Sequence, residues 1–215
     1  MFTLNSKTSK FAAISIAVIL IEKFIASMIF RSFSSQDSNF DLIIDLQGFV
    51  FAWMVPLLIV YLIEGRDLRS IGLVIERKNY VKYFIYSVVG LIIPAFIVGF
   101  NKALLISLVQ QLVSIGVAEE VLWRGFLQAR LSAWLGKYQG WVIASLLFGF
   151  GHLVSLWSHP GINPEIGDLI LLGQTTAGGF ILGFIFLRAK SIVPGAIFHV
   201  FGNVYLFKLI DLMIG

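Results

Sequence analysis

Cysteine is absent from this chain, and charged residues are scarce. Without cysteine, the 215 residues can form neither disulfide bonds nor metal sites built from thiolates. Only 13% of the residues are charged and 58% are hydrophobic, whereas a soluble domain is about a quarter charged. The composition therefore predicts an integral membrane protein with an all-α fold, a polytopic transmembrane helical bundle. Its 20 glycines suit helices that pack closely in lipid, and we expect such packing at the GxxxG pattern formed by Gly179 and Gly183.

Apolar segments long enough to cross a bilayer recur along the whole chain. We expect about seven spans, at residues 11–30, 41–64, 83–100, 103–135, 140–157, 166–187 and 191–214. The expected bundle therefore has between six and eight transmembrane spans. No soluble domain or internal repeat interrupts the pattern, and residues 1–215 are treated as a single integral-membrane domain.

Positive charge is divided unequally between the predicted loops. Because cytoplasmic loops carry the excess of lysine and arginine, the distribution predicts a multi-pass protein of the cell membrane with a cytoplasmic N-terminus. The positive residues on this side are Lys7, Lys10, the basic group between 66 and 82, Arg130, Lys137, Arg188 and Lys190. Only Arg31 and Lys102 fall on the other side.

Two adjacent carboxylates and an arginine lie within the fourth apolar segment, at Glu119, Glu120 and Arg124. Ionisable groups are costly at bilayer depth, so they normally face the bundle interior and mark functional sites. On a helix, Glu120 and Arg124 are spaced i, i+4, and we expect them to pair and to fix this face of the helix. Glu119 is rotated about 100° from Glu120 and has no partner in its own segment, which makes it a candidate base or ligand. A second acid–base pair, Glu22-Lys23, interrupts the first span, and we expect it to pair locally or to face neighbouring helices.

Two of the histidines lie in later apolar segments, each with an i, i+4 companion on the same face. Phe148 accompanies His152 and supports it, and Asn203 accompanies His199. The third histidine, His159, falls in a predicted loop, where we expect a surface position.

Together these side chains predict a site that hydrolyses amides. Glu119 would accept a proton from a water molecule, and His152 would position that water, directly or through a bound divalent cation. His199 and Asn203 would donate hydrogen bonds to the developing oxyanion or complete a metal sphere. If a metal such as zinc is used, Glu119, His152 and His199 are its candidate ligands. Other intramembrane protease patterns are missing, because the chain has no HExxH, no GxGD and no Gly-x-Ser with a suitable downstream histidine.

In order and spacing these residues resemble the CPBP family of intramembrane proteases, which includes the type II CAAX prenyl endopeptidases and the bacterial Abi proteins. The family pattern is EExxxR, then FxxxH, then HxxxN on separate helices, and the chain carries all three within residues 103–205, the expected catalytic core. The resemblance implies an α-helical bundle with a site open toward the cytoplasm, and peptidase activity. It implies that Glu119 and His152 activate water and that His199 with Asn203 holds the oxyanion, and it leaves the need for a metal open.

The resemblance also leaves the substrate open between a prenylated CAAX peptide, a bacteriocin precursor and another membrane protein. The expected partners are the lipid bilayer and a peptide or membrane-protein substrate, with no nucleic acid. Two alternatives differ in class. One is a non-enzymatic protein of the same fold, such as an immunity factor or scaffold. The other is an ion-coupled transporter, which would be expected to show internal repeats that this sequence lacks.

Overall fold

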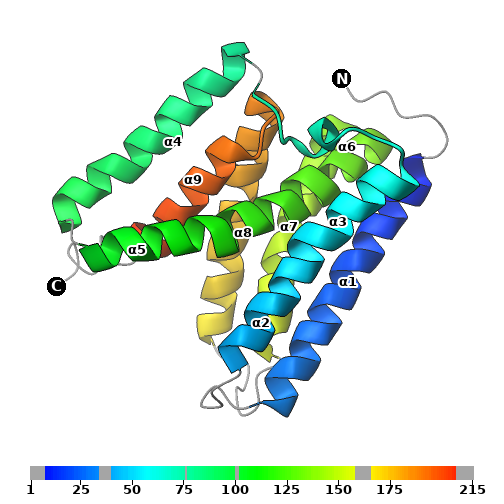
Figure 1. The fold of residues 1–215 in the computed structure, drawn as a ribbon, viewed down its shortest axis with the longest axis horizontal. Helices are drawn as coiled ribbons and strands as arrows, with labels where there is room; N and C mark the ends of the chain where they lie inside the picture. Colours follow the sequence, from blue (N-terminus) through cyan, green and yellow to red (C-terminus); the bar gives the residue numbers. More distant parts are fainter. Residues whose placement is uncertain (1–7, 34–39, 76, 100–101, 158–165, 207–215) are drawn as a thin grey trace.

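The computed structural model describes residues 8–33, 40–75, 77–99, 102–157 and 166–206, and within these ranges it contains helices and no strand (Figure 1). The predicted all-α bundle is confirmed. His159 lies outside the described residues. The α-helices are α1 Thr8–Ser32, α2 Phe40–Gly48, α3 Val55–Leu58, α4 Arg77–Val98, α5 Lys102–Gln111, α6 Ala129–Leu135, α7 Lys137–Trp157, α8 Ile166–Ala189 and α9 Val193–Phe201. The π- and 3₁₀-helical stretches are η1 Phe49–Met54, η2 Ile59–Ile63, η3 Leu68–Ile71, η4 Leu112–Val117, η5 Glu120–Gln128 and η6 Gly202–Leu206.

Five helical stretches in the described part of the chain are long and apolar enough to cross a membrane. They are Ser9–Ile29, Leu42–Ile63, Asn79–Val98, Leu104–Leu135 and Asp168–Ala189, and they correspond to the first four predicted spans and the sixth. The fifth predicted span coincides with α7, and the described part of the seventh with α9 and η6. Helix α4 begins at Arg77, earlier than predicted, so part of the basic segment between residues 66 and 82 is helical rather than a loop.

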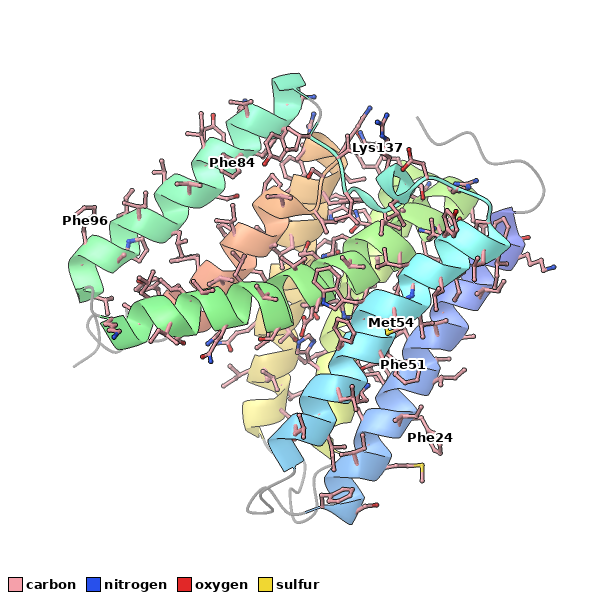
Figure 2. The ribbon with its side chains drawn as sticks, viewed as in Figure 1. Phe24, Phe51, Met54, Phe84, Phe96 and Lys137 are labelled. Atoms are coloured by element: carbon pink, nitrogen blue, oxygen red, sulfur yellow. The ribbon has the colours of Figure 1, made fainter. Side chains whose placement is uncertain are left out.

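Large apolar side chains point outward from the bundle. Phe24 on α1 is 65% exposed and Phe96 on α4 is 84% exposed, and both project away from the helices in Figure 2. A soluble protein rarely exposes contiguous apolar surface of this kind. These faces suit the hydrocarbon of a bilayer, in agreement with the predicted membrane protein.

The fourth predicted span is one continuous helix, built from α5, η4, η5 and α6. It runs across the other helices rather than alongside them (Figure 1). The apolar stretch Leu104–Leu135 has 32 residues. A tilted helix can accommodate an apolar stretch that is longer than the bilayer is thick. Its η5 segment is completely buried, and π-helical turns of this kind are frequent at functional sites.

Helices α7 and α8 pack closely at the glycines of the predicted GxxxG pattern. A Cβ added at Gly179 would lie 2.9 Å from the carbonyl oxygen of Ser145, and one at Gly183 would lie 2.7 Å from Oε1 of Gln128. The amide of Gln128 also donates to the Gly183 carbonyl at 3.0 Å, which ties η5 to α8. The predicted close packing at these glycines is confirmed.

Arg130 is buried, whereas the sequence predicted it at the membrane surface. Its Nε and Nη2 atoms donate to the two carboxylate oxygens of Glu64 at 2.7 and 2.9 Å. Its Nη1 donates to the carbonyls of Gly125 and Phe126 at 2.9 and 3.1 Å. The side chains of Arg130 and Glu64 are only 3% and 1% exposed. The prediction was wrong because the partner that buries Arg130, Glu64, lies 66 positions earlier in the chain. Because Arg130 is buried, it does not contribute to the excess of exposed positive charge that predicted the orientation in the membrane.

Candidate active site

Glu119 lies between the two histidines that the sequence singled out. Its Oε2 atom is 3.8 Å from Nε2 of His152 on α7 and 3.8 Å from Nε2 of His199 on α9. These separations are too long for direct hydrogen bonds, but a water molecule can bridge polar groups at such distances. The side chains of Glu119 and His152 are 28% and 30% exposed, although the Glu119 Oε2 atom that faces the histidines is buried. The structure thus brings together three side chains from three separate helices.

The orientation of His152 follows from its position one helical turn after Phe148. Its Nδ1 atom lies 2.8 Å from the Phe148 carbonyl oxygen, and because a carbonyl only accepts, Nδ1 must carry the proton. In the neutral ring Nε2 is then an acceptor, and it faces Glu119. The Phe148 ring lies beside the His152 ring, with centroids 4.5 Å apart. Phe148 therefore supports His152, as predicted from their spacing.

Glu120 and Arg124 form the predicted ion pair. Nη1 of Arg124 is 3.2 Å from Oε1 of Glu120, and both side chains are almost completely buried. The guanidinium also lies over the Phe148 ring, 4.1 Å from its centroid, a favourable cation–π arrangement. Oε1 of Glu120 is 3.5 Å from Nδ1 of His199. Glu120 therefore holds one side of the His199 ring while the other side faces Glu119.

The Glu120 carboxylate reaches His199 because α9 has a glycine where the two segments meet. A Cβ added at Gly195 would lie 2.7 Å from Oε2 of Glu120, closer than nonbonded atoms approach. Gly195 is buried at the start of α9, one turn before His199. Only a residue without a side chain permits this contact.

We expect Gly195→Ala to lower kcat/KM by roughly 10–10²-fold, because small misplacements of catalytic groups cost this much. The new methyl group would displace a carboxylate that is buried and paired, and with it the His199 ring. Cleavage rates and thermal unfolding of the purified variant would measure the effect. Gly173→Ala on α8 is the matched control, since a Cβ there meets nothing within 4 Å. Equal activity of the two variants would contradict this account of Gly195.

Asn203 is the one predicted site residue that the structure leaves apart from the others. It lies in η6, and it is exposed. Its role at the oxyanion stays a prediction.

The arrangement was also tested against a metal site. Among the residues that the structure describes, no group of three or more His, Asp or Glu side chains is placed to hold a metal ion. Whether Glu119, His152 and His199 bind zinc, whose ligand atoms lie about 2.0–2.2 Å from the ion, stays a prediction.

Comparison with known proteins adds the family. Residues 101–205 match the family model described as type II CAAX prenyl endopeptidase, Rce1-like. Residues 101–205, just under half of the chain, are thus similar to the Rce1-like family. The match contains every predicted site residue and confirms the resemblance that the three motifs indicated. Neither the curated proteins nor the solved structures contain a significant match.

Similarity to the Rce1-like family supports a membrane-embedded protease of the CAAX type. The match does not reach α1 to α4, so nothing in it describes how the first half of the chain contributes to the site. Sequence reasoning also missed Gly195, whose contact with Glu120 joins two helices. One further residue near the site could be noticed in the sequence, because Lys23 is a charged residue within an apolar span. In the structure its Nζ atom lies 5.9 Å from the centroid of the Trp123 ring.

Proposed function

We propose that this protein is an intramembrane endopeptidase in which Glu119 and His152 activate a water molecule. The observation that supports the proposal is the placement of one Glu119 oxygen 3.8 Å from each of the two histidine Nε2 atoms. A water in that space would donate one hydrogen to Glu119 and the other to Nε2 of His152. Both hydrogen atoms of the water are then bound, and a lone pair of its oxygen remains free to attack a peptide carbonyl carbon.

Glu119 acts first as a general base and then as a general acid. It takes the proton of the attacking water and returns it to the leaving amine when the tetrahedral intermediate collapses. Proton transfer by a positioned side chain contributes about 10²–10⁴-fold to a rate. The Glu120–Arg124 pair stays intact throughout and keeps the helix face that carries Glu119 in place.

His199 supplies a hydrogen bond to the oxyanion. In this role the ring carries protons on both nitrogens, with Nδ1 directed at Glu120 and Nε2 at the substrate oxygen. An oriented donor in a site that excludes water is worth about 2.7–4 kcal/mol of transition-state stabilisation. We assign the second donor to the Asn203 amide, which belongs to the helix end that follows His199.

The family name points to a prenylated CAAX peptide as the substrate class, with a bacteriocin precursor or another membrane protein as the alternatives. We place the protein in the cell membrane with a cytoplasmic N-terminus. A non-enzymatic scaffold or immunity protein of the same fold is the competing function, and it predicts no turnover at all.

The proposal is tested with purified protein in vesicles and fluorogenic peptides, prenylated and unprenylated, with and without a strong chelator. We expect cleavage of at least one peptide class, with the rate unchanged by the chelator because Glu119 and His152 act on the water directly. Loss of activity in chelator that zinc restores would contradict the metal-free mechanism. Absence of cleavage in every peptide class would favour the scaffold.

A further inference from the structure

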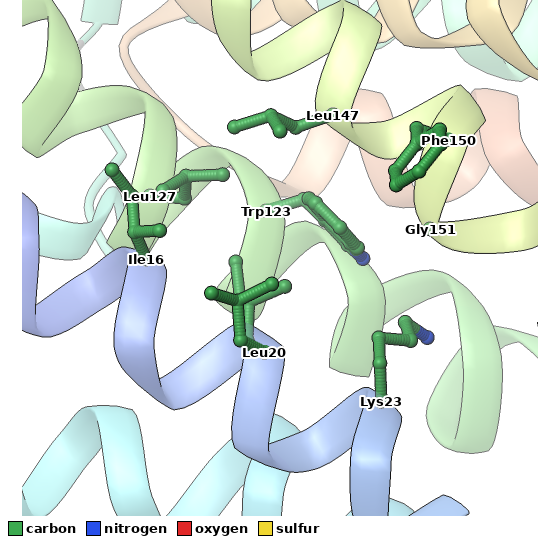
Figure 3. A pocket seen from close by; sticks show the side chains of 9 residues that line it. Ile16, Leu20, Lys23, Trp123, Leu127, Leu147, Phe150 and Gly151 are labelled. Carbon is green, nitrogen blue, oxygen red and sulfur yellow. The ribbon is translucent and has the colours of Figure 1, made fainter. Parts of the chain in front are cut away.

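A small apolar cavity adjoins the candidate site on the side of α1. Its volume is about 70 Å³, roughly half of the ~150 Å³ that accommodates a benzene ring. Figure 3 shows Ile16 and Leu20 of α1 facing Leu147 and Phe150 of α7, with Trp123 of η5 between them. Leu20 is 63% exposed, so the cavity lies at the edge of the bundle. Its size and lining suit one small aliphatic side chain.

This cavity lies close to the candidate site, although none of Glu119, His152 and His199 lines it. Gly151 lines the cavity and directly precedes His152. Trp123 also lines it, and its ring packs edge-on against the Phe148 ring, with centroids 5.3 Å apart. The Phe148 carbonyl in turn holds the His152 ring. A substrate side chain in the cavity would therefore lie close to the helical turn that carries His152.

Lys23 stands at the rim of the cavity and brings a positive charge to it. Its Nζ is 3.2 Å from Oε2 of Glu22, and the other carboxylate oxygen of Glu22 accepts from Gln47 at 3.2 Å. The predicted local pairing of Glu22 and Lys23 is thus confirmed. Lys23 is held over the Trp123 ring, near Gly151, where an added Cβ would lie 3.4 Å from its Cε.

The ammonium of Lys23 retains capacity to bind a further group. It carries three N–H donors, and within the described residues Glu22 is its only oxygen partner. The Lys23 side chain is 19% exposed. Arg124, the other cation at the site, is 2% exposed and already paired. Lys23 is therefore the cation that a substrate can reach.

We propose that Lys23 and this cavity form a specificity subsite for an apolar residue accompanied by a carboxylate. The cavity takes the aliphatic side chain, and the Lys23 ammonium binds the carboxylate, which belongs either to the peptide C-terminus or to an acidic side chain. Both sources supply a carboxylate, and its negative charge complements the positive charge of Lys23. The subsite rests on the proposed peptidase function, but it is built from α1, outside the part of the chain that the family match covers.

The test measures binding, so that it does not depend on turnover. Fluorescent peptides with a leucine and a free C-terminal carboxylate are compared with their carboxamide forms on Glu119→Gln protein in vesicles. A second arm compares peptides with Glu or Gln beside the leucine, all with an amidated terminus. We expect the acid form to bind about tenfold more tightly in one arm, as a hydrogen bond between charged groups provides. The arm that responds identifies the source of the carboxylate.

Lys23→Met should abolish this preference and bring the acid-to-amide ratio of Kd values close to one. Lys23→Arg should retain the preference for the acid peptide, because the guanidinium keeps the positive charge. Glu22→Gln should also retain it, because the Lys23 ammonium is still present. A merely structural role for Lys23 would weaken both peptides of a pair equally and would overturn the proposal. So would the absence of any acid preference in both arms.

The cavity is tested separately with Leu20→Trp, which adds bulk to the cavity wall from a position that is 63% exposed. We expect this variant to weaken binding of leucine peptides and to spare the matching alanine peptides. Equal weakening of both would exclude the cavity from the subsite. If the subsite variants behave as expected while wild-type protein cleaves nothing, the peptidase function fails and the binding site stands. If the wild-type protein cleaves peptides but the variants keep the wild-type acid-to-amide ratio of Kd values, the subsite fails and the peptidase function stands.

Discussion

Glu119→Gln is expected to lower kcat by about 10²–10⁴-fold, the contribution of a positioned general base. The amide has nearly the shape of the carboxylate but does not accept a proton from water. Folding should be unaffected, because the Glu119 side chain is 28% exposed and its Oε2 atom has no hydrogen-bond partner to lose. Initial cleavage rates and thermal unfolding, measured on the same preparation, separate these two effects.

The matched control for this substitution is Asp67→Asn. It makes the same change from acid to amide at a side chain that is 67% exposed and caps η3 away from the site. Its cleavage rate should equal that of the wild-type protein. Wild-type rates in Glu119→Gln as well would remove Glu119 from the mechanism and leave the peptidase proposal without its base.

Arg130→Met is expected to give the largest loss of stability, roughly 3–5 kcal/mol, because it leaves the Glu64 carboxylate buried and deprived of its partner. The loss should fall toward the lower end of this range, since Arg66 lies 3.6 Å from the same carboxylate and still offsets its charge. The carbonyls of Gly125 and Phe126 also lose a donor. The free energy of unfolding in mixed micelles measures the change.

The double variant Glu64→Leu/Arg130→Met distinguishes the cost of an unpaired charge from the loss of packing. Buried ion pairs replaced by apolar residues of similar volume are often neutral or stabilising. We therefore expect the double variant to recover most of the stability that Arg130→Met loses. A double variant as unstable as the single one would show that the pair holds η5 and α6 through its geometry rather than its charge balance.

Contacts within one helix could be predicted from the sequence. The Glu120–Arg124 pair and the contact of Phe148 with His152 follow from i, i+4 spacing, which is the same in every helix. Composition and the lengths of the apolar segments likewise predicted an all-α membrane bundle, and the three motifs indicated the CPBP family, which includes the type II CAAX prenyl endopeptidases. Each of these inferences depends on residues that are close together in the chain or on a pattern that repeats along it.

Contacts between helices were decided by the tertiary structure alone. The burial of Arg130 against Glu64, the fit of Gly195 to the Glu120 carboxylate, and the approach of Lys23 to Trp123 each join distant segments. Such contacts depend on how each helix is tilted and rotated, and packing against neighbouring helices sets both. The sequence by itself predicted which side chains would carry the chemistry. Only the packed bundle decided that Glu119 meets both histidines at one point and that the first helix lies beside them.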